Sequence, residues 1–588
     1  MSAVQLVVRL RSLGVRLHAE GDKLKYKAPP GVLDDGTLAE IKAAKPEIME
    51  ILRQADSVQH TIHYVPVRDG TKLSAEVFRP KRDGSVVREA LPAVWCHERY
   101  NRSTLADGET RLDTQPWLRR LLAAGYVVVA VDARGSGAST GQRVTEFSRE
   151  EVLDSHDVTE WLAAQPFCDG NVGMFGDSYL GIAQLLAAAA APPHLKAIFP
   201  GVAMHDLYSF LYPGGVFRND FAGRWGDMVR SLKEDNSTGI FVQSGRLRFR
   251  DSVDPQTGEA PYVAQSPSSA AEAITASGVP VCLLSGWYDL WVRDAFAWFT
   301  NLGNPRRLIV GPWCHNDRAG LDLAAEHLRW FDTWLKGIDT GVMDEPPIRY
   351  YTIGAQPGEQ WRTATVWPLP HARPHTLHLH PGGVLDEPAA EAGADAYRVD
   401  YTTTTGRQTR WANGYMTYAF GRDRFRYDLR DNDSKAMVYT SAPLPADLEV
   451  TGHPIMHLFA SSTHDDGDFF VYLEEVDPEG TSHYVTEGVL RASHRALGPP
   501  PYDFMGLPFH PGTQESLLPW DGEPVELVID LHPTSWIFKA GHQIRLAITG
   551  CDRDNALTPR HDPAPVVHLH RGGVHPSRLV LPVEESPS

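Results

Sequence analysis

The chain has 588 residues, 42% of them hydrophobic and 22% charged, which is ordinary for a globular protein. Its length exceeds what one compact core can hold, so roughly two to four domains are expected. A formal net charge of −18 argues against a nucleic-acid-binding protein and against binding to an anionic membrane surface. No apolar run reaches the roughly 18 residues of a membrane span.

Cysteine usage and the first residues bear on the cellular compartment. The five cysteines are scattered, odd in number and without metal-site spacing, which favours unpaired thiols in a reducing compartment. The initial segment "MSAVQLVVRLRSLGVRLHAEGDK" lacks a signal-peptide layout, because arginines interrupt its apolar positions. We therefore expect a cytoplasmic protein that uses neither a metal nor another cofactor.

Residues 1–55 are predicted to form a small helix–hairpin–helix module. The first stretch, "VQLVVRLRSLGV", has helical apolar spacing. The next segment alternates around a Gly-Asp pair, a hairpin signature in which Leu24 and Tyr26 share a face.

The last part of this module, "TLAEIKAAKPEIMEILRQ", is predicted to be helical. It opens with Thr37 and Glu40 at the spacing of a capping box. Pro46 should kink or divide this helix, because proline cannot donate a backbone hydrogen bond.

From about residue 60 to 195, strand-like and helix-like runs alternate. The runs "LPAVWC", "YVVVAVDARG" and "NVGMFG" are short and almost wholly apolar, as parallel strands covered on both faces require. The alternation fades between about 200 and 275 and resumes with "VPVCLLSGWYD" and "RRLIVGPWCH". This pattern predicts an α/β domain with a parallel sheet, interrupted by an inserted helical cap.

Beyond about residue 345 the strands "DFFVYLEEV", "PVELVIDL" and "HQIRLAITG" are separated by turn residues, which favours an all-β sandwich or jelly roll. The His-rich stretch "HTLHLHPGG" is a poor metal site, because no carboxylate or cysteine lies nearby. The expected division of the chain is 1–55 for the small module, 56–198 and 277–345 for the α/β domain, 199–276 for the cap and 346–588 for the β domain.

A possible nucleophile lies in "NVGMFGDSYLGIAQLL". Ser178 sits between a strand and a helix, with Gly176 before it and Gly181 after it. A sharp strand-to-helix turn of this kind exposes a serine hydroxyl above a sheet. The pattern is G-x-S-x-x-G and departs by one residue from the commonest version, so taken alone it fits a structural turn equally well.

Two later strand ends carry an acid and a base in the order expected after the serine. Asp289 follows one buried strand and His315 follows the next. Because catalytic residues gather at the carboxyl ends of parallel strands, we expect a Ser178–His315–Asp289 triad. The alternatives are that Asp289 caps a helix, and that His315 binds a metal with Cys314.

Several motifs together resemble the cocaine esterase/X-Pro dipeptidyl-peptidase family of serine hydrolases. They are "DARGSGAST", "WLAAQPFCDGNVGMFGDSYLG", "GWYD", "GPWCH" and "LRWFDTWLKG". The resemblance covers about residues 60–588 and implies an α/β-hydrolase domain with an inserted helical cap and a C-terminal jelly roll. It also implies the roles given above to Ser178, Asp289 and His315.

The same resemblance implies an oxyanion hole. The family uses a tyrosine hydroxyl from the loop after an early strand, and "PAVWCHERYNR" places Tyr100 at that position; an exposed loop aromatic is the alternative. The second donor would be the backbone N–H of Tyr179. Asp132 and Arg134 in "DARGSG" are expected to shape a nearby loop.

The acyl pocket is expected to take a neutral or hydrophobic group. Relatives that hydrolyse α-amino-acid esters hold the ammonium with acids two and three residues after the triad aspartate, where this chain has Trp291 and Val292. Core packing is the alternative for each aromatic residue proposed as a pocket wall. Beside Trp291 these candidates are Tyr208, Tyr212, Phe217 and Trp225.

Residues 3 to about 54 resemble the N-terminal docking domains of tubulysin-type nonribosomal peptide synthetases. Such domains bind a short C-terminal peptide of an upstream synthetase, partly by adding it to a hairpin edge. The expected partners are that peptide and its carrier protein; a solvated hairpin face is the alternative. The candidate docking residues are Lys23, Leu24, Lys25, Tyr26 and Lys27.

Taken together, the sequence predicts a serine acyl-hydrolase that forms an acyl-Ser178 intermediate on an ester, thioester or amide of a nonribosomal peptide or polyketide assembly line. One alternative is an acyltransferase, in which an amine or alcohol intercepts the same intermediate. A second is a catalytically silent docking or scaffold protein, which the presence of all three triad residues disfavours. The oligomeric state is left open, with a homodimer as one option.

Overall fold

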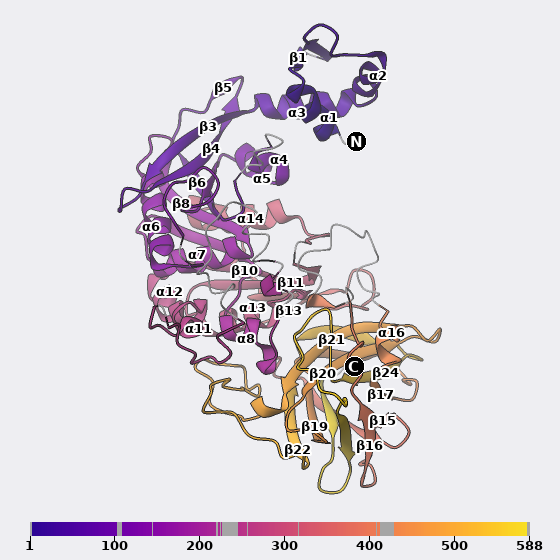
Figure 1. Ribbon diagram of the computed structural model, residues 1–588. Coiled ribbons are helices and arrows are strands. Elements are labelled where there is room, and N and C mark those ends of the chain that lie inside the picture. Colours follow the sequence, from indigo (N-terminus) through magenta and orange to yellow (C-terminus); the bar gives the residue numbers. More distant parts are fainter. Residues whose placement is uncertain are drawn as a thin grey trace.

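The computed structural model describes residues 3–20, 22–102, 109–143, 145–218, 221–223, 225, 245–255, 257–315, 317–406, 409–411 and 428–584. In Figure 1 the N-terminal module lies at one end of the molecule, the α/β body in the middle and the β-rich part at the other end. The module projects away from the sheet that carries the candidate site (Figure 1).

The N-terminal module has a core of its own. Its elements are α1 (Ala3–Ser12), β1 (Arg16–Glu20), β2 (Lys23–Lys27), α2 (Asp35–Ala43) and α3 (Lys45–Asp56). Strands β1 and β2 form an antiparallel hairpin, as predicted. The core consists of Leu6, Val7, Leu10, Val15, Ile41, Ile48 and Leu52.

The predicted second helix is divided into two, and its start differs from the prediction. Helix α2 ends before Pro46, and α3 begins at Lys45, so the proline lies in the first turn, where its missing N–H is not needed. The N-cap is Asp34, whose side chain accepts a hydrogen bond from the Thr37 N–H at 2.7 Å. Thr37 is thus inside the helix, because the better-placed aspartate occupies the cap.

The α/β body is built on a sheet with the strand order β13-β12-β11-β10-β9-β8-β6-β7-β4-β3. Neighbouring strands from β7 through β6, β8, β9, β10 and β11 to β12 are parallel, whereas the outer pairs are antiparallel. The strands are β3 (Val58–Pro66), β4 (Lys72–Arg82), β5 (Ser85–Val86), β6 (Leu91–Glu98), β7 (Val127–Asp132), β8 (Cys168–Asp177), β9 (Leu195–Gly201), β10 (Val281–Tyr288), β11 (Arg306–Cys314), β12 (Ile348–Tyr351) and β13 (Trp361–Ala364). All five predicted apolar runs are strands of this sheet, and β12 and β13 extend it beyond residue 345.

Helices cover this sheet in two groups. Helices α6, α7 and α12 pack together beside β8 and β9, and α5 packs with α14 beside β7 and β8. The helices of the body are α4 (Arg111–Thr114), α5 (Leu118–Ala123), α6 (Arg149–Ala163), α7 (Tyr179–Ala189), α12 (Ala271–Ser277), α13 (Val292–Asn301) and α14 (Leu323–Lys336). The inserted segment contains α8 (Leu207–Leu211), η1 (Pro213–Gly215), α11 (Pro261–Ala264) and η2 (Pro267–Ala270).

The C-terminal part is a largely antiparallel β structure. Its strands are β14 (Arg373–His380), β15 (Val384–Asp386), β16 (Gly393–Arg398), β17 (Met437–Thr440), β18 (Leu448–Gly452), β19 (Ile455–Ser462), β20 (Asp468–Val476), β21 (Ser482–Arg491), β22 (Val525–Asp530), β23 (Thr534–Phe538), β24 (Gln543–Thr549), β25 (Val566–Arg571) and β26 (Arg578–Glu584). Two short helical turns, α16 (Arg430–Asp433) and η3 (Ala492–His494), accompany them. Together these parts confirm the predicted fold: an α/β-hydrolase domain with an inserted cap, a β-rich C-terminal domain and a small N-terminal module.

Candidate active site

The three candidate triad residues each follow directly after a parallel strand. Ser178 comes after β8, Asp289 after β10 and His315 after β11. Since β8, β9, β10 and β11 are parallel neighbours, their carboxyl ends meet at one edge of the sheet. The fold therefore places these three residues at one edge of the sheet, although Ser178 is more than a hundred positions from Asp289 in the chain.

Ser178 lies in a strained turn between β8 and α7. Its φ is 64° and its ψ is −124°, a conformation that non-glycine residues seldom adopt. Its N–H donates to the Gly201 carbonyl at 2.9 Å. A Cβ on Gly181 would lie 2.4 Å from that carbonyl oxygen, and one on Gly176 would lie 2.7 Å from the Leu180 Cβ. The flanking glycines are thus needed for the close approach that raises the serine above the sheet.

His315 is held by the Asp289 carboxylate. The distance from His315 Nδ1 to Asp289 Oδ2 is 2.6 Å, and Asp289 is fully buried. Its other oxygen, Oδ1, accepts the Trp291 N–H at 2.7 Å. Because a carboxylate only accepts hydrogen bonds, Nδ1 must carry the proton, which leaves Nε2 free to accept one. This is the tautomer that a general base beside a serine requires.

Tyr100, predicted as an oxyanion donor, lies beside Ser178. Burial raises the pKa of its hydroxyl, while hydrogen bonds with Trp225 and Ser178 act in the opposite direction. The indole Nε1–H of Trp225 donates to the Tyr100 oxygen at 3.2 Å. Since that oxygen already accepts from Trp225, the Tyr100 hydroxyl proton is available to donate toward the serine and whatever is bound to it.

The side chain of Tyr179 is anchored away from the reacting edge. Its hydroxyl donates to the Glu151 carboxylate, with oxygen–oxygen distances of 2.8 and 2.9 Å, and its ring stacks on Phe147 at a centroid distance of 4.5 Å. Burial and the charge of Glu151 raise the pKa of Tyr179 well above its usual value. The anchored side chain fixes the first residue of α7 and thereby the direction of its backbone N–H.

An ion pair that the sequence analysis missed ties the histidine loop to the serine turn. The Arg318 Nη2 donates to Asp177 Oδ2 at 3.0 Å, and Nη1 donates to the His315 carbonyl at 3.2 Å. Arg318 is three residues after His315 and Asp177 is directly before Ser178. No pattern in the sequence pairs these two residues, because they meet only when β8 and β11 lie in one sheet.

Aromatic side chains of the cap and of the loop after β10 divide into two groups. Trp291 packs edge-on against the His315 ring at a centroid distance of 5.2 Å, and Phe210 packs against Trp291 at 5.1 Å. With Trp225 beside Tyr100, these residues surround the reacting groups with apolar surface. Phe210 was not predicted from the sequence.

The other predicted wall residues lie in a second aromatic cluster. Tyr208 and Tyr212 stack at a centroid distance of 5.5 Å, Tyr212 stacks on Phe217 at 4.9 Å, and Tyr262 packs edge-on against Tyr208. The Phe217 carbonyl accepts the Leu557 N–H at 3.0 Å, which joins this cluster to the β-rich domain. These contacts are typical of packing between the cap and that domain.

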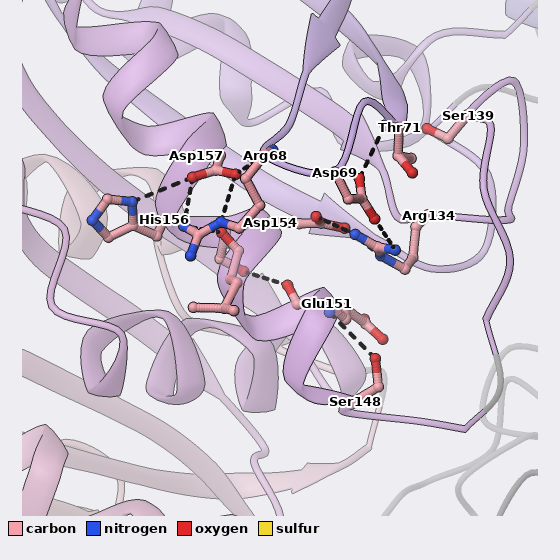
Figure 2. A network of polar contacts seen from close by, with 12 residues as sticks. Arg68, Asp69, Thr71, Arg134, Ser139, Ser148, Glu151, Asp154, His156 and Asp157 are labelled. Atoms are coloured by element: carbon pink, nitrogen blue, oxygen red, sulfur yellow. Dashed lines mark hydrogen bonds and ion pairs between the residues drawn. The ribbon is translucent and has the colours of Figure 1, made fainter.

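The "DARGSG" segment holds a loop beside the site. Figure 2 shows the Arg134 guanidinium between Asp154 and Asp69, with nitrogen–oxygen distances of 2.6 and 3.0 Å to the nearest oxygens. Asp132 accepts the backbone N–H groups of Arg102 and Ala138 at 2.7 and 3.0 Å. These contacts agree with the expected structural role of Asp132 and Arg134.

The candidate docking residues lie on β2, far from this site (Figure 1). Lys23, Lys25 and Lys27 are exposed on the strand. Tyr26 is 49% exposed, whereas Leu24 packs against the small core of the module. Leu24 and Tyr26 are two residues apart in the strand and so point to one side of the hairpin.

Within the described ranges, no group of three or more histidine, cysteine, aspartate or glutamate residues is arranged to hold a metal ion. In that same part of the chain, none of the helices has the length and apolar character needed to cross a membrane.

Solved structures with a similar fold cover most of the chain. A CocE/NonD family hydrolase from Staphylococcus aureus aligns with a TM-score of 0.70 at 20% identity, over 90% of this chain and 97% of that one. An α-amino acid ester hydrolase aligns with a TM-score of 0.68 at 20% identity and the same coverage. At this identity the likeness concerns the fold, which is that of an α/β-hydrolase with a β-rich C-terminal domain.

Family models and sequence relatives define the class more narrowly. Residues 69–317 match the X-Pro dipeptidyl-peptidase (S15) family, residues 340–580 its C-terminal non-catalytic domain, and residues 4–54 the TubC N-terminal docking domain. A Mycobacterium bovis protein whose name describes it as a serine esterase is 34% identical, over 88% of this chain and 94% of its own. Cocaine esterase from a Rhodococcus species is 28% identical, over 88% and 97%.

The chain is therefore a serine hydrolase of the α/β type. It belongs to the cocaine esterase/X-Pro dipeptidyl-peptidase family, as its motifs indicated, and carries a docking-domain sequence at its N-terminus.

Proposed function

We propose that Ser178 attacks an acyl carbonyl with His315 as its general base and Asp289 as the group that orients and stabilises the imidazolium. The observation that carries this proposal is the 2.6 Å hydrogen bond between His315 and Asp289 at the strand edge that also carries the Ser178 turn. His315 takes the serine proton and then gives it to the leaving group, which produces an acyl-Ser178 intermediate.

The oxyanion of each tetrahedral intermediate is bound by the Tyr100 hydroxyl and the Tyr179 N–H. Support comes from the contact of Tyr100 with Ser178 and from the anchoring of Tyr179 through Glu151. Water then attacks the acyl-enzyme, with His315 again as the base. An amine or alcohol in place of water would give acyl transfer by the same steps.

The acyl group is neutral or apolar. Trp291 occupies the position next to His315, and Phe210 continues the apolar surface away from it. A free ammonium placed there would lose its hydration without gaining a carboxylate partner, which makes an α-amino acyl group a poor substrate.

The natural substrate is an acyl or peptidyl chain of a nonribosomal peptide or polyketide assembly line, presented on a carrier protein. The match of residues 4–54 to a docking domain supports this context. We also propose the division of the chain into a docking domain (1–55), an α/β-hydrolase domain in two parts with a cap between them, and a jelly roll. Docking would raise the effective concentration of the tethered chain at a site whose intrinsic affinity is weak.

The test compares wild type with Ser178→Ala. A fluorophosphonate probe should label wild type and leave Ser178→Ala unlabelled, since the probe reacts with an activated serine. Mass spectrometry of carrier-bound intermediates should show an acyl or peptidyl chain that accumulates only with Ser178→Ala. Analysis of the products formed with added amines or alcohols separates hydrolysis from acyl transfer. Equal labelling of both proteins would refute the nucleophile, and unchanged carrier intermediates would refute the assembly-line substrate.

A further inference from the structure

A buried arginine of the β-rich domain reaches the loop that carries Asp289. Arg410 is fully buried and belongs to the described segment 409–411. Its Nη1 donates to the carbonyl oxygens of Trp287 and Asp289, at 2.8 and 3.2 Å. The first carbonyl is near the end of β10, and the second belongs to the candidate triad acid itself.

The rest of the guanidinium is bound by β21. Its Nε donates to Glu487 Oε1 at 2.9 Å and to the Tyr484 hydroxyl at 3.2 Å, and its Nη2 donates to Thr486 Oγ1 at 3.0 Å. A guanidinium is planar, and its donors point in fixed directions. Arg410 therefore joins the acid loop rigidly to β21, the last strand in the order of the β-rich sheet.

The segment that presents Arg410 is fixed on both sides. Before it, the Thr405 hydroxyl donates to the buried Asp552 carboxylate at 2.7 Å. After it, the Trp411 ring lies under the Arg218 guanidinium of the cap at 3.6 Å and packs edge-on against His532. These contacts place the arginine independently of the acid loop.

The position of the acid loop decides the orientation of the base. Asp289 Oδ1 accepts the Trp291 N–H, and Oδ2 is hydrogen-bonded to His315 Nδ1. A shift of the Asp289 backbone would therefore also move the imidazole. We infer that Arg410 is a positioning residue for the triad, contributed by the β-rich domain, which holds Asp289 in the place from which it orients His315. This inference rests on the proposed role of Asp289.

The alternative is that the Arg410–Glu487 ion pair only stabilises the fold. Removal of Arg410 alone would not distinguish this role from positioning of the triad. Such a change leaves the buried Glu487 carboxylate without the guanidinium that is hydrogen-bonded to it, which is strongly destabilising in itself. The double variant Arg410→Met/Glu487→Gln removes both charges and keeps similar volumes. Arg410→Lys provides a second variant, because it keeps a cation beside Glu487 but loses the planar fork.

The measurement is kcat and KM for p-nitrophenyl butyrate, together with the midpoint of thermal unfolding, all on the full chain. We expect Arg410→Met/Glu487→Gln to unfold near the wild-type temperature and to lose kcat by roughly tenfold to a hundredfold, because small misplacements of a catalytic group have effects of this size. Its KM should change by less than about threefold, since the lost interaction acts on the chemical step. Arg410→Lys should lose less kcat than the double variant.

The matched control is Arg545→Met/Asp433→Asn. It removes another ion pair of the same β structure, with a nitrogen–oxygen distance of 2.9 Å, in which Arg545 also donates to Ser482 and Thr440. It should leave kcat unchanged. The inference is overturned if Arg410→Met/Glu487→Gln keeps wild-type kcat, changes only KM, or loses no more kcat than the control. Asp289→Ala is measured beside them: if it keeps wild-type kcat, the proposed triad itself fails.

Discussion

The proposed oxyanion hole depends on the hydroxyl group of one residue, Tyr100. It lies beside Ser178 and accepts a hydrogen bond from Trp225, which leaves its own proton available to donate to an oxyanion. Burial raises its pKa, which keeps the hydroxyl protonated and able to donate near neutral pH. A preorganised donor of this kind stabilises the oxyanion more than the ground-state carbonyl.

Tyr100→Phe should therefore lower kcat by about 100-fold or more and leave KM nearly unchanged, because one oxyanion donor contributes about 3–4 kcal/mol. Steady-state kinetics with a p-nitrophenyl ester measure this change. Tyr208→Phe, which removes a hydroxyl from the aromatic cluster at the β-rich domain, serves as the control and should keep wild-type kcat. A kcat for Tyr100→Phe within about threefold of wild type would exclude the tyrosine as a donor.

Among the secondary-structure elements, the β1–β2 hairpin is the candidate docking edge. Its second strand exposes three lysines and a half-exposed tyrosine, and the core beneath it belongs to the module alone. An extended acidic peptide could add to such a strand through backbone hydrogen bonds, with the lysines contributing electrostatic attraction.

Charge reversal by Lys23→Glu/Lys25→Glu/Lys27→Glu should weaken binding of an acidic peptide by roughly tenfold or more, because like charges would face each other. Fluorescence anisotropy with a labelled peptide of alternating aspartate and leucine measures the affinity, which should also fall as salt is added. Lys42→Glu/Lys45→Glu, on the helices of the same module, is the control. If both variants bind the peptide equally well, the hairpin is not the docking edge. The esterase activity of each variant should be unchanged.

At the scale of the whole molecule, buried histidines link stability to pH. Burial lowers the pKa of each in the folded state below the value of about 6.5 in an unfolded chain. The folded-state values are about 4 for His97, His205, His327 and His494 and about 3 for His453. Burial also raises the pKa of three carboxyl groups, Asp132, Asp154 and Asp294, to about 6, which acts in the opposite direction.

The contribution of these histidines to stability should therefore fall as pH decreases from about 6.5 toward about 4, because the unfolded chain binds protons that the folded histidines do not. Each histidine that binds one proton more in the unfolded chain adds roughly 1 kcal/mol per pH unit to this loss. Urea unfolding followed by fluorescence between pH ~7 and ~5 measures the slope. In His327→Gln the slope should be shallower by roughly 1 kcal/mol per pH unit; an unchanged slope would show that this histidine takes no part.

Much of the molecule could be predicted from local sequence patterns. Apolar runs indicate strands that are buried on both faces, and they predicted β6, β7, β8, β10 and β11. Pro46 predicted the break between two helices. The cap of α2 was misplaced because Asp34 and Thr37 are both good capping residues and only backbone geometry selects between them. The order of Ser178, Asp289 and His315 after three such strands was enough to predict that they lie at one edge of the sheet, and His315 and Asp289 are hydrogen-bonded there.

The reacting groups and the elements that carry them can be identified from the sequence, because strand periodicity and strand-end position are local properties. The residues that hold those groups in place are visible only in the folded chain: Arg318 against Asp177, Trp225 against Tyr100, and Arg410 against the acid loop. The tertiary structure also decided which aromatic residues lie at His315 and which join the cap to the β-rich domain. These contacts join positions that are far apart in the chain, and their hydrogen-bond geometry leaves no periodic trace in the sequence.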